Sequence, residues 1–376
     1  MKIGIITVQK APENYGACLQ CFALWKYLKT QGYDCQVIDL MRPWSNRYIK
    51  SKIFPEKSCT KHTSIIRKVL SLLKGQGSKQ EHNEPFENEM FKAFNGLIDY
   101  SKTYYSVDEL YANPPEYDVY ISGSDQIWNP LISFINQPYF LTFAPRNKRK
   151  ISYASSFAVK EIPKGVWPLK LDWLSDFYSI SVRESSGVSI VKDVFGRDAT
   201  VVLDPTMLLT KTDWEEQLIL PNEHGYFLVY TLQYNSVIVR HAKRLSKKYK
   251  VKLIIIVSST TDNYIVDDDV TVVEAGPKEW LGYFYNADFI FTDSFHGSVF
   301  SILFQKNFVT ICTNALVSER LQTLFESFCI QSNYITLDEL AGIETIDSYN
   351  YNKEEVNCKL DTGRNVSREF LRNAIN

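Results

Sequence analysis

Residues 287–304, ADFIFTDSFHGSVFSILF, join two apolar stretches through a short polar loop. Asp288–Thr292 has the length and the aromatic composition of a buried strand, and Ser298–Phe304 has the continuous apolar character of a buried helix. Strand–loop–helix units of this kind build parallel α/β sheets, whose ligands bind at the loops that follow the strands. One of the five histidines of the chain, His296, lies in this loop. The stretch therefore predicts an α/β fold with a polar site in it.

The chain on both sides of this stretch alternates in the same way. Strand patterns are present at Tyr226–Thr231, Lys252–Val257, Asp288–Thr292 and Asn307–Ile311. Helix patterns lie between them, at Ser236–Tyr249, Lys278–Tyr285 and Ser298–Phe304. This alternation predicts a Rossmann-like unit in the C-terminal part of the chain.

The N-terminal part begins with a second unit of the same kind. Its predicted strand–helix–strand order is Lys2–Val8, Ala17–Thr30 and Cys35–Leu40. Further strand patterns are Tyr117–Ile121, Lys150–Ala154, Ser179–Val182 and Thr200–Leu203, and they lead into the loops Ser122–Asn129, Ser155–Phe157, Arg183–Ser185 and Asp204–Thr206. Because the carboxyl ends of parallel strands meet at one edge of a sheet, we expect these four loops to lie together.

The length of 376 residues favours two domains over one. We expect two Rossmann-like domains that face a cleft, residues 1–210 and 211–345, and a helical tail, residues 346–376, that packs back on them. The first domain is expected to be the acceptor side. A basic insertion at about residues 42–89 interrupts the first domain. It is interpreted either as an exposed segment with one packed amphipathic helix, Ser64–Lys74, or as a basic face for an anionic membrane or a lipid-linked substrate.

The composition excludes several classes of function. Lys and Arg number 42 against 43 Asp and Glu, so the charge gives no general case for nucleic-acid binding. The N-terminus lacks the apolar core of a signal peptide and no segment reaches ~18 apolar residues, so a cytoplasmic protein is expected. Seven cysteines without tight pairing favour reduced thiols. Cys18 and Cys21 form a CxxC, which is interpreted as core packing rather than metal or redox chemistry.

His296 is the first candidate for chemistry. Unpaired backbone N–H groups at a helix start favour an anion, and Ser294, Gly297 and Ser298 are small enough to let one approach. The ordinary pKa of histidine lies near neutral pH, which suits acid–base catalysis. The alternative is a histidine that caps the helix or is satisfied within the core.

Arg183 ends a predicted buried strand at the same expected ligand edge. Its planar guanidinium could hold a carboxylate or a phosphate through two hydrogen bonds. The alternative is a structural ion pair with Glu184, Asp204 or another buried acid.

Two further loops supply weaker candidates. Asn14, Tyr15 and Gly16 occupy the first strand-to-helix turn, which lacks the glycine patterns of dinucleotide and Walker loops. Asn14 suits a helix cap as well as a ligand contact. In the segment SGSDQIWN, Asp125 and Trp128 combine a carboxylate with a flat aromatic surface, as in many sugar sites, although Trp128 equally suits a core.

Taken together, these motifs resemble the polysaccharide pyruvyl transferase family. The resemblance rests on the segments NYGACLQCFAL, SGSDQIWN, SYASSFA, ISVRESSGV, VVLDPT and TDSFHGSVFSILF, whose order and spacing cover roughly residues 1–330. It implies a two-domain GT-B-like fold and the transfer of a pyruvyl group from phosphoenolpyruvate to a sugar as a ketal.

The resemblance also implies roles for single residues. His296 matches the acid–base histidine of the family, and Arg183 matches an arginine that contacts the phosphoenolpyruvate anion. Some members carry Arg-Leu-His where this chain has Ser294-Phe295-His296, and Arg320 is the candidate to replace the missing cation. The other expected substrate contacts are Asn14, Tyr15, Gly16, Ser124, Asp125, Gln126, Trp128, Ser294, Phe295, Gly297 and Ser298.

The chemistry of ketal formation agrees with these roles. The reaction protonates the methylene carbon of the donor and deprotonates two sugar hydroxyls, and one histidine can serve these steps. The helix starts at Gly16 and Gly297, together with Arg183, offer donors suited to a carboxylate and a phosphate. We expect no metal and no cofactor beyond the donor substrate.

Three functions are retained at this point. The leading expectation is a pyruvyl transferase acting on a hexose of a capsule, exopolysaccharide or cell-wall precursor, carried as a lipid-linked intermediate that brings the enzyme to the membrane surface. The alternatives are a nucleotide-sugar glycosyltransferase of the same architecture and a sugar- or anion-binding relative without turnover.

Overall fold

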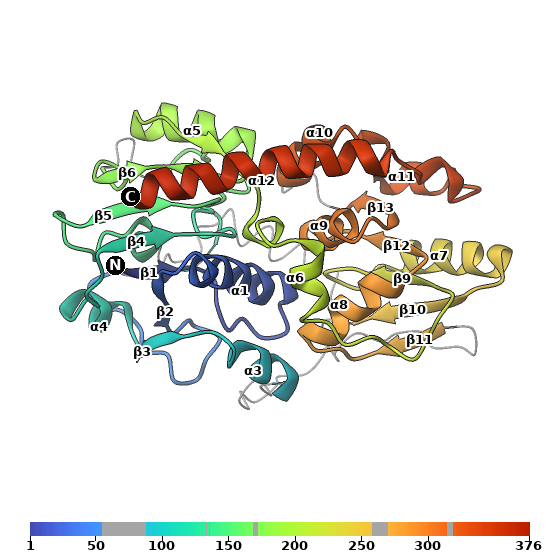
Figure 1. The fold of residues 1–376 in the computed structure, drawn as a ribbon, viewed down its shortest axis with the longest axis horizontal. Coiled ribbons are helices and arrows are strands. Elements are labelled where there is room, and N and C mark those ends of the chain that lie inside the picture. Colours follow the sequence, from blue (N-terminus) through green and yellow to red (C-terminus); the bar gives the residue numbers. More distant parts are fainter. Residues whose placement is uncertain (55–87, 133, 135, 168–171, 258–269, 314–318) are drawn as a thin grey trace.

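The computed structural model describes residues 1–54, 88–132, 134, 136–167, 172–257, 270–313 and 319–376. Within these residues the chain forms two six-stranded sheets, ordered β3-β2-β1-β4-β5-β6 and β11-β10-β9-β12-β13-β14 (Figure 1). All pairings within both sheets are parallel. The two strand orders are equivalent, which is the arrangement of two Rossmann-like halves. The predicted helix Ser64–Lys74 of the insertion lies outside the described residues.

The first sheet is built by the N-terminal half. Its strands are β1 (Lys2–Ile6), β2 (Asp34–Leu40), β3 (Tyr100–Tyr104), β4 (Val119–Ser122), β5 (Arg149–Ser152) and β6 (Phe177–Ser179). The helical segments of this half are α1 (Tyr15–Thr30), α3 (Glu89–Asn95), α4 (Val107–Ala112), η1 (Gln137–Phe140) and α5 (Ser185–Phe195). A two-stranded parallel sheet, β7 (Ser181–Val182) with β8 (Thr200–Val201), continues beside β5.

The second sheet is built by the C-terminal half. Its strands are β9 (Tyr226–Tyr230), β10 (Lys252–Ile256), β11 (Val270–Val273), β12 (Phe289–Thr292), β13 (Asn307–Cys312) and β14 (Tyr334–Thr336). Its helices are α7 (Ser236–Tyr249), α8 (Pro277–Asn286), α9 (Phe295–Leu303), α10 (Glu319–Phe328) and α11 (Leu337–Leu340). The central strands β9 and β12 are buried at every position, because helices cover both faces of a parallel sheet.

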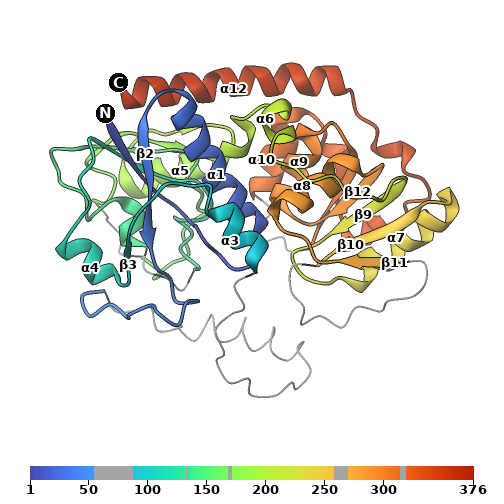
Figure 2. The ribbon, with the colours of Figure 1, turned by 60° about the horizontal axis from the view of Figure 1, so that its bottom comes forward.

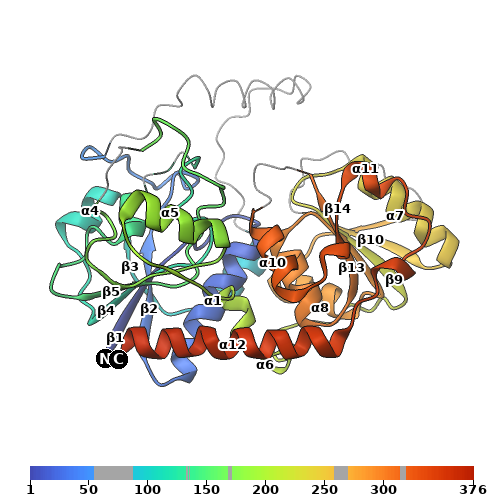
Figure 3. The ribbon, with the colours of Figure 1, turned by 90° about the horizontal axis from the view of Figure 1, so that it is seen from above.

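The halves are connected by η2 (Pro205–Met207) and α6 (Lys211–Glu215), and a long C-terminal helix, α12 (Lys353–Ile375), returns to the first half. Figures 1, 2 and 3 show α12 running along both halves, so that the two ends of the chain lie side by side. Arg149 donates to the carbonyl of Ala374 at 3.3 Å, and Leu203 N donates to Ser367 Oγ at 2.9 Å. These bonds fix the C-terminal part of the helix to the first half.

The halves also meet directly, at the start of α1. Tyr15 donates its hydroxyl to the carbonyl of Ala275 at 2.7 Å, and its ring stacks on Trp280 of α8 with centroids 5.4 Å apart. Phe91 of α3 and Tyr230 of β9 complete an aromatic cluster around Tyr15. We call this contact between the halves, with the residues around His296 beside it, the junction.

Several predicted elements need correction. The predicted strand Ser179–Val182 is divided into β6 and β7, which belong to different sheets. The predicted helix start at Ser298 lies too late, because Ser294 caps α9 and His296 already lies in its first turn. Cys18 and Cys21 are buried within α1, which confirms core packing for this CxxC pair.

Candidate active site

His296 lies at the start of α9, directly after the central strand β12. Ser294 holds this turn, because its hydroxyl accepts from the backbone N–H of Gly297 at 3.2 Å. The imidazole is 7% exposed and reaches across the junction to α1 of the other half. A Cβ added at Gly16 would lie 2.1 Å from His296 Nδ1, so only glycine leaves room for the ring.

The turn that contains Gly16 serves this contact between the halves. Asn14 caps α1 by accepting from Ala17 N at 3.0 Å, which is the capping alternative that the sequence left open. Tyr15 is buried in the aromatic cluster of the junction, and burial raises the pKa of its hydroxyl far above the ordinary value. The turn therefore positions His296 and shows no phosphate cradle of its own.

Three of the predicted loops of the first half meet beside His296. Arg183 donates to Asp204 Oδ2 at 2.7 Å and to Asp125 Oδ1 at 3.2 Å. The same oxygen of Asp204 lies 3.7 Å from His296 Nε2. Asp125 and Val182 each form a parallel bridge with Ser155. The prediction that these loops share one edge is thus confirmed, and they join the first half to His296 of the second.

The charged side chains of this cluster shift one another's pKa values. Burial alone would raise the pKa of Asp204, but the nearby His296 and Arg183 outweigh it and hold that pKa far below its ordinary value. Asp125 follows the same pattern: Arg183, His296 and Arg320 lower its pKa against the effect of burial. Both carboxylates are therefore ionised at neutral pH. Arg183 is 4% exposed and bound at both terminal nitrogens, which is the ion-pairing alternative that the sequence left open.

Arg320 of α10 differs from Arg183 in its partners. Its guanidinium lies 5.4 Å from the ring centroid of Phe295, while that of Arg183 lies 4.4 Å from the same ring. With its amide oxygen turned inward, Gln126 accepts from Arg320 at 2.8 and 3.1 Å. No carboxylate of the described residues lies within ion-pair distance of Arg320, and its Nε is buried without a partner. Burial, and then the charge of Arg183, lower the pKa of Arg320 to about 10.

A cavity of about 360 Å³ adjoins this cluster. Arg183, Asp204, Phe295 and Arg320 form its polar end. Side chains of α10 and α12, among them Leu324 and Val366, provide the apolar walls. The unpaired guanidinium of Arg320 thus faces a space of the size that small-molecule sites have.

The structure places other predicted contacts away from this cluster. Trp128 has no exposed surface: its ring stacks on Phe140 with centroids 4.9 Å apart, and its Nε1 donates to the carbonyl of Tyr139 at 2.9 Å. The expected sugar contact of Trp128 is therefore corrected to a core position. Ser124 is also fully buried, and its hydroxyl donates to the carbonyl of Ala154 at 2.7 Å.

The hydroxyl of Ser298 likewise has its hydrogen-bond partners within the fold. Its hydroxyl donates to the carbonyl of Ser294 at 2.9 Å and lies 2.7 Å from the hydroxyl of Thr310. It thus anchors α9 to β13 behind the turn that carries His296.

The sequence indicated Asp204 only as a partner of Arg183, but in the structure it also contacts Thr206 and lies beside His296. Its second oxygen accepts from the backbone N–H of Thr206 at 3.0 Å and from the Thr206 hydroxyl at 2.7 Å. One carboxylate therefore binds Arg183 of the first half and lies beside His296 of the second. The signal that could have found it is a carboxylate directly after an apolar run at the expected ligand edge.

Two features of the described residues bear on cofactors and location. No group of three His, Cys, Asp or Glu side chains in the described ranges is arranged to hold a metal ion. Among the helices that the structure describes, none combines the length and the apolar character that a bilayer span requires.

Two Rossmann-like halves joined at a buried cluster of charges define a GT-B-like enzyme, the architecture of many enzymes that process sugars. A sequence profile of polysaccharide pyruvyl transferases matches residues 14–313. The chain therefore belongs to the polysaccharide pyruvyl transferase family and is a transferase enzyme. No curated protein sequence matches it.

Solved structures with a similar fold are sugar-processing enzymes. S. aureus MnaA in complex with UDP shares 11% identity at a TM-score of 0.50, over 96% of this chain and 90% of that one. The UDP-GlcNAc 2-epimerase of Methanocaldococcus jannaschii shares 11% at 0.50, over 99% and 100%. The glycotransferase of kitacinnamycin shares 12% at 0.50, over 99% and 97%. At these identities the similarity shows the fold alone.

Proposed function

We propose that the protein transfers the pyruvyl group of phosphoenolpyruvate to two hydroxyls of a hexose in a surface-polysaccharide precursor, as a ketal. The membership of the family supports the transfer of a pyruvyl group. The donor, the roles of single residues and the kind of precursor are the parts that the proposal adds.

The observation that carries the proposal is the environment of His296. Its Nε2 is buried and has no hydrogen-bond partner, although it lies at the junction 3.7 Å from Asp204. Buried polar atoms of native proteins are nearly always satisfied, so an unsatisfied imidazole nitrogen supports a reactive or ligand-binding role. His296 is the proposed acid–base catalyst.

The donor anion is assigned to Arg320. Phosphoenolpyruvate carries a carboxylate and a phosphate. A buried guanidinium without an anionic partner binds such groups strongly, because it donates charged hydrogen bonds to them. Arg183 is already bound to Asp125 and Asp204, so we assign it to holding these carboxylates in place rather than to gripping the donor. This assignment replaces the donor-contacting role that the family resemblance implied for Arg183.

The proposed reaction begins with proton transfer. Protonated His296 gives its proton to the methylene carbon of phosphoenolpyruvate, which becomes a methyl group and leaves positive charge at C2. A sugar hydroxyl then bonds to C2 and returns its proton to the imidazole. Acid–base catalysis of this kind contributes roughly 100- to 10,000-fold to the rate.

Phosphate leaves in the second stage. The C–O bond to phosphate breaks with its electron pair on the phosphate oxygen, so C2 again carries positive charge. Protonated His296 gives its proton to the departing phosphate oxygen. A second hydroxyl of the same hexose then bonds to C2 and passes its proton to the imidazole, which completes the ketal, restores protonated His296 and leaves inorganic phosphate as the other product. The ionised Asp125 and Asp204 balance the positive charge at both stages.

The proposal is tested by phosphate release from phosphoenolpyruvate, measured with and without galactose, glucose and N-acetylmannosamine glycosides. Mass spectrometry of the sugar identifies the product. We expect release that depends on one glycoside, and a glycoside heavier by one pyruvate less one water.

Two results of this assay would refute the proposal. If phosphate is never released and a nucleotide sugar raises the melting temperature, the protein is a glycosyltransferase and the proposal fails. If neither occurs with any glycoside, the site binds without turnover and the proposal fails as well.

A further inference from the structure

We propose that a pocket at the carboxyl ends of β1, β2 and β3 binds a neutral sugar residue of the acceptor glycan. We call it the Trp44 pocket; its volume is about 580 Å³, and the residues that matter here are Gln9, Glu13, Asp39, Trp44, Ser45 and Thr103. The inference rests on the proposed function, because it assigns the acceptor of the same reaction. None of these residues was a predicted site residue.

The position of the pocket is that of a ligand site. Its walls come from the loop after β1, the end of β2 with the segment that follows it, the start of α3 and one residue of β3. Ligands of open α/β sheets bind beyond the carboxyl ends of the strands, which is where these segments meet. The pocket belongs to the first half, while His296 and Arg320 come from the second.

Asp39 organises the floor of the pocket. It is 4% exposed and accepts from Gln9 at 3.1 Å, from Lys10 at 2.7 Å and from Thr103 at 2.7 Å. The other polar atom of the Gln9 amide, Oε1, is buried without a partner. Gln9 is itself 5% exposed, so a fixed and unsatisfied hydrogen-bonding group belongs to the pocket lining.

An aromatic side chain forms part of the wall. Trp44 is half-buried, and the guanidinium of Arg42 lies 5.0 Å from its ring. Arg42 is in turn fixed by Tyr139, whose hydroxyl accepts from Arg42 Nε at 2.8 Å. A rigid indole beside fixed polar groups is the combination that binds a sugar, because the ring packs on C–H groups while the amides and carboxylates bind hydroxyls.

The charges of the pocket favour a neutral ligand. Lys10 is paired with Asp39 at 2.7 Å and Lys92 with Glu89 at 3.6 Å. Arg42 is stacked on Trp44, and the guanidinium of Arg47 lies 4.8 Å from the Tyr105 ring. Each of these cations already has an ionic or aromatic partner, so the pocket offers hydrogen bonds rather than an anion site.

The pocket also lies within reach of His296. Glu13 lines it, and burial followed by the charge of Glu274 from the second half raises the pKa of Glu13. Gly16, which contacts His296, follows three residues later. Three residues span at most about 11 Å, which is roughly the length of two sugar rings. A glycan bound at the Glu13 side of the pocket can therefore extend to the sugar that accepts the pyruvyl group.

Two residues of the same loop have left-handed backbone conformations. Lys10 and Glu13 have positive φ angles of 47° and 50° although neither is glycine. Such conformations cost free energy and persist mainly at functional sites.

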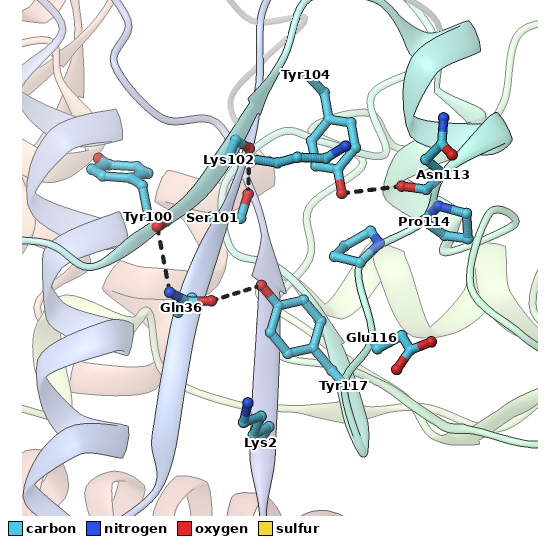
Figure 4. A pocket seen from close by; sticks show the side chains of 11 residues that line it. Lys2, Gln36, Tyr100, Ser101, Lys102, Tyr104, Asn113, Pro114, Glu116 and Tyr117 are labelled. Atoms are coloured by element: carbon cyan, nitrogen blue, oxygen red, sulfur yellow. Dashed lines mark hydrogen bonds between the residues drawn. The ribbon is translucent and has the colours of Figure 1, made fainter.

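A second pocket of the first half provides a contrast. It has a volume of about 430 Å³ and three tyrosines, but its polar groups bind one another (Figure 4). Tyr117 donates to Gln36 Oε1 at 3.2 Å, and Tyr104 donates to the carbonyl of Asn113 at 3.2 Å. It includes Lys2 at the start of β1, away from the carboxyl end of that strand. Aromatic lining alone therefore does not distinguish the Trp44 pocket, and neither does a buried polar atom without a partner, since the Tyr100 hydroxyl of the second pocket also lacks one. The distinguishing feature is the position of the Trp44 pocket at the carboxyl ends of the strands.

Trp44→Ala tests the inference in two ways. In steady-state kinetics, KM for the acceptor should rise by about 10-fold while KM for phosphoenolpyruvate stays unchanged. By calorimetry, neutral tri- and tetrasaccharides of galactose, glucose and N-acetylmannosamine should bind the wild-type protein. They should bind the variant at least about 10-fold more weakly.

Two further variants keep the test decisive. Ser45→Tyr fills the pocket without removing a core side chain, and it should weaken glycan binding in the same way. Tyr178→Ala is the matched control, because Tyr178 is an exposed aromatic residue of the same half with Arg149 stacked 4.4 Å from its ring. This control should change neither binding nor KM.

Each outcome bears on one of the two proposals. Trp44-dependent glycan binding without phosphate release from phosphoenolpyruvate would support the pocket and refute the proposed reaction. Pyruvyl transfer with an acceptor KM that Trp44→Ala and Ser45→Tyr leave unchanged would refute the pocket alone. Absence of neutral-glycan binding to the wild type, or tighter binding of acidic glycans, would also overturn it.

Discussion

The loop after β4 and the loop after β12 occupy equivalent places in the two sheets, since each follows the strand beside the first strand of its half. The first loop carries Asp125, held in a left-handed conformation with φ 71°, and the next α-helix among the described residues is α5. The second runs directly into α9 and carries His296 in the first helical turn. One topological position therefore supplies a carboxylate in one half and an imidazole in the other.

The difference shows how the junction separates its tasks. Asp125, together with Asp204, gives the first half fixed negative charge through Arg183. The second half contributes the groups without ionic commitment, which are the buried Nε2 of His296 and the unpaired Arg320. The account thus places proton transfer and anion binding in the second half and their electrostatic support in the first.

The strongest test of this division is His296→Gln. The change retains a polar side chain of similar size but removes the proton carrier, so kcat should fall by roughly 100- to 10,000-fold. Turnover should be measured beside His241→Gln, a buried histidine of α7 in the same half, which should leave kcat unchanged. Equal activity of both variants would remove His296 from the mechanism.

Gly16→Ala tests the contact across the junction without touching a polar group. The added methyl group would overlap His296 Nδ1, so the imidazole must move and kcat should fall by about 100-fold. Gly342→Ala is the control, since its added Cβ meets nothing closer than 3.5 Å. An active Gly16→Ala enzyme would show that catalysis does not depend on the observed position of the ring.

Arg320→Gln tests the anion assignment. Loss of a charged hydrogen-bond donor should raise KM for phosphoenolpyruvate by about 10- to 100-fold and leave acceptor KM unchanged. Arg364→Gln is the matched control: Arg364 is a buried arginine of α12 that donates to the carbonyl of Met207 at 2.9 Å, and its loss should lower the melting temperature only.

Arg183→Gln should behave differently from Arg320→Gln. It leaves the buried Asp125 and Asp204 without their cation, so the expected effect is a loss of about 3 kcal/mol of folding stability, measured by urea unfolding. A stable Arg183→Gln protein with a large rise in donor KM would reverse the roles assigned to the two arginines.

The smallest expected effect concerns Asp293, which precedes His296 in the second loop. Burial raises the pKa of Asp293 to about 6, although hydrogen bonds from Leu232 N and Thr313 partly oppose it. Because the folded state disfavours ionisation, the carboxylate costs stability as pH rises from about 4, and this cost is complete above about pH 6. Asp293→Asn should therefore gain about 1 kcal/mol in unfolding free energy at pH 8 and nothing at or below pH 4.

The control for this prediction is Asp288→Asn at the opposite end of β12, where the carboxylate is exposed. At pH 8 its unfolding free energy should not exceed that of the wild type. A gain for Asp293→Asn that is the same at both pH values would show that packing rather than charge is responsible.

Much of the central sheet structure could be predicted because apolar runs mark its strands. β9, β10 and β12 are continuous apolar runs whose predicted ranges match within a residue or so. The edge strand β3, YSKTY, was missed because only one of its five positions is buried and its residues are mostly polar. The buried stripe of α12 also includes the polar residues Arg364 and Ser367, so its apolar pattern is weak as well. These side chains are satisfied by hydrogen bonds to distant backbone atoms, which no local pattern reveals.

The candidate site was predictable in its parts and not in its connections. His296, Arg183 and Asp125 could be selected because each follows a strand at one edge. The partners of each guanidinium depend on how the halves meet, so the sequence could not tell the paired Arg183 from the unpaired Arg320. The prediction for Trp128 was wrong because the sequence pattern of an aromatic residue beside polar ones is the same whether its ring faces a ligand or, as here, stacks on Phe140.

The most direct test of the central claim follows the pyruvyl carbon itself. Phosphoenolpyruvate labelled with ¹³C at C2 is incubated with the acceptor glycan and either the wild-type protein or His296→Gln, and the glycan is examined by NMR. The account predicts a labelled ketal carbon with the wild type and none with the variant. An equally labelled glycan from both proteins, or no label from the wild type with an acceptor that it binds, would contradict it.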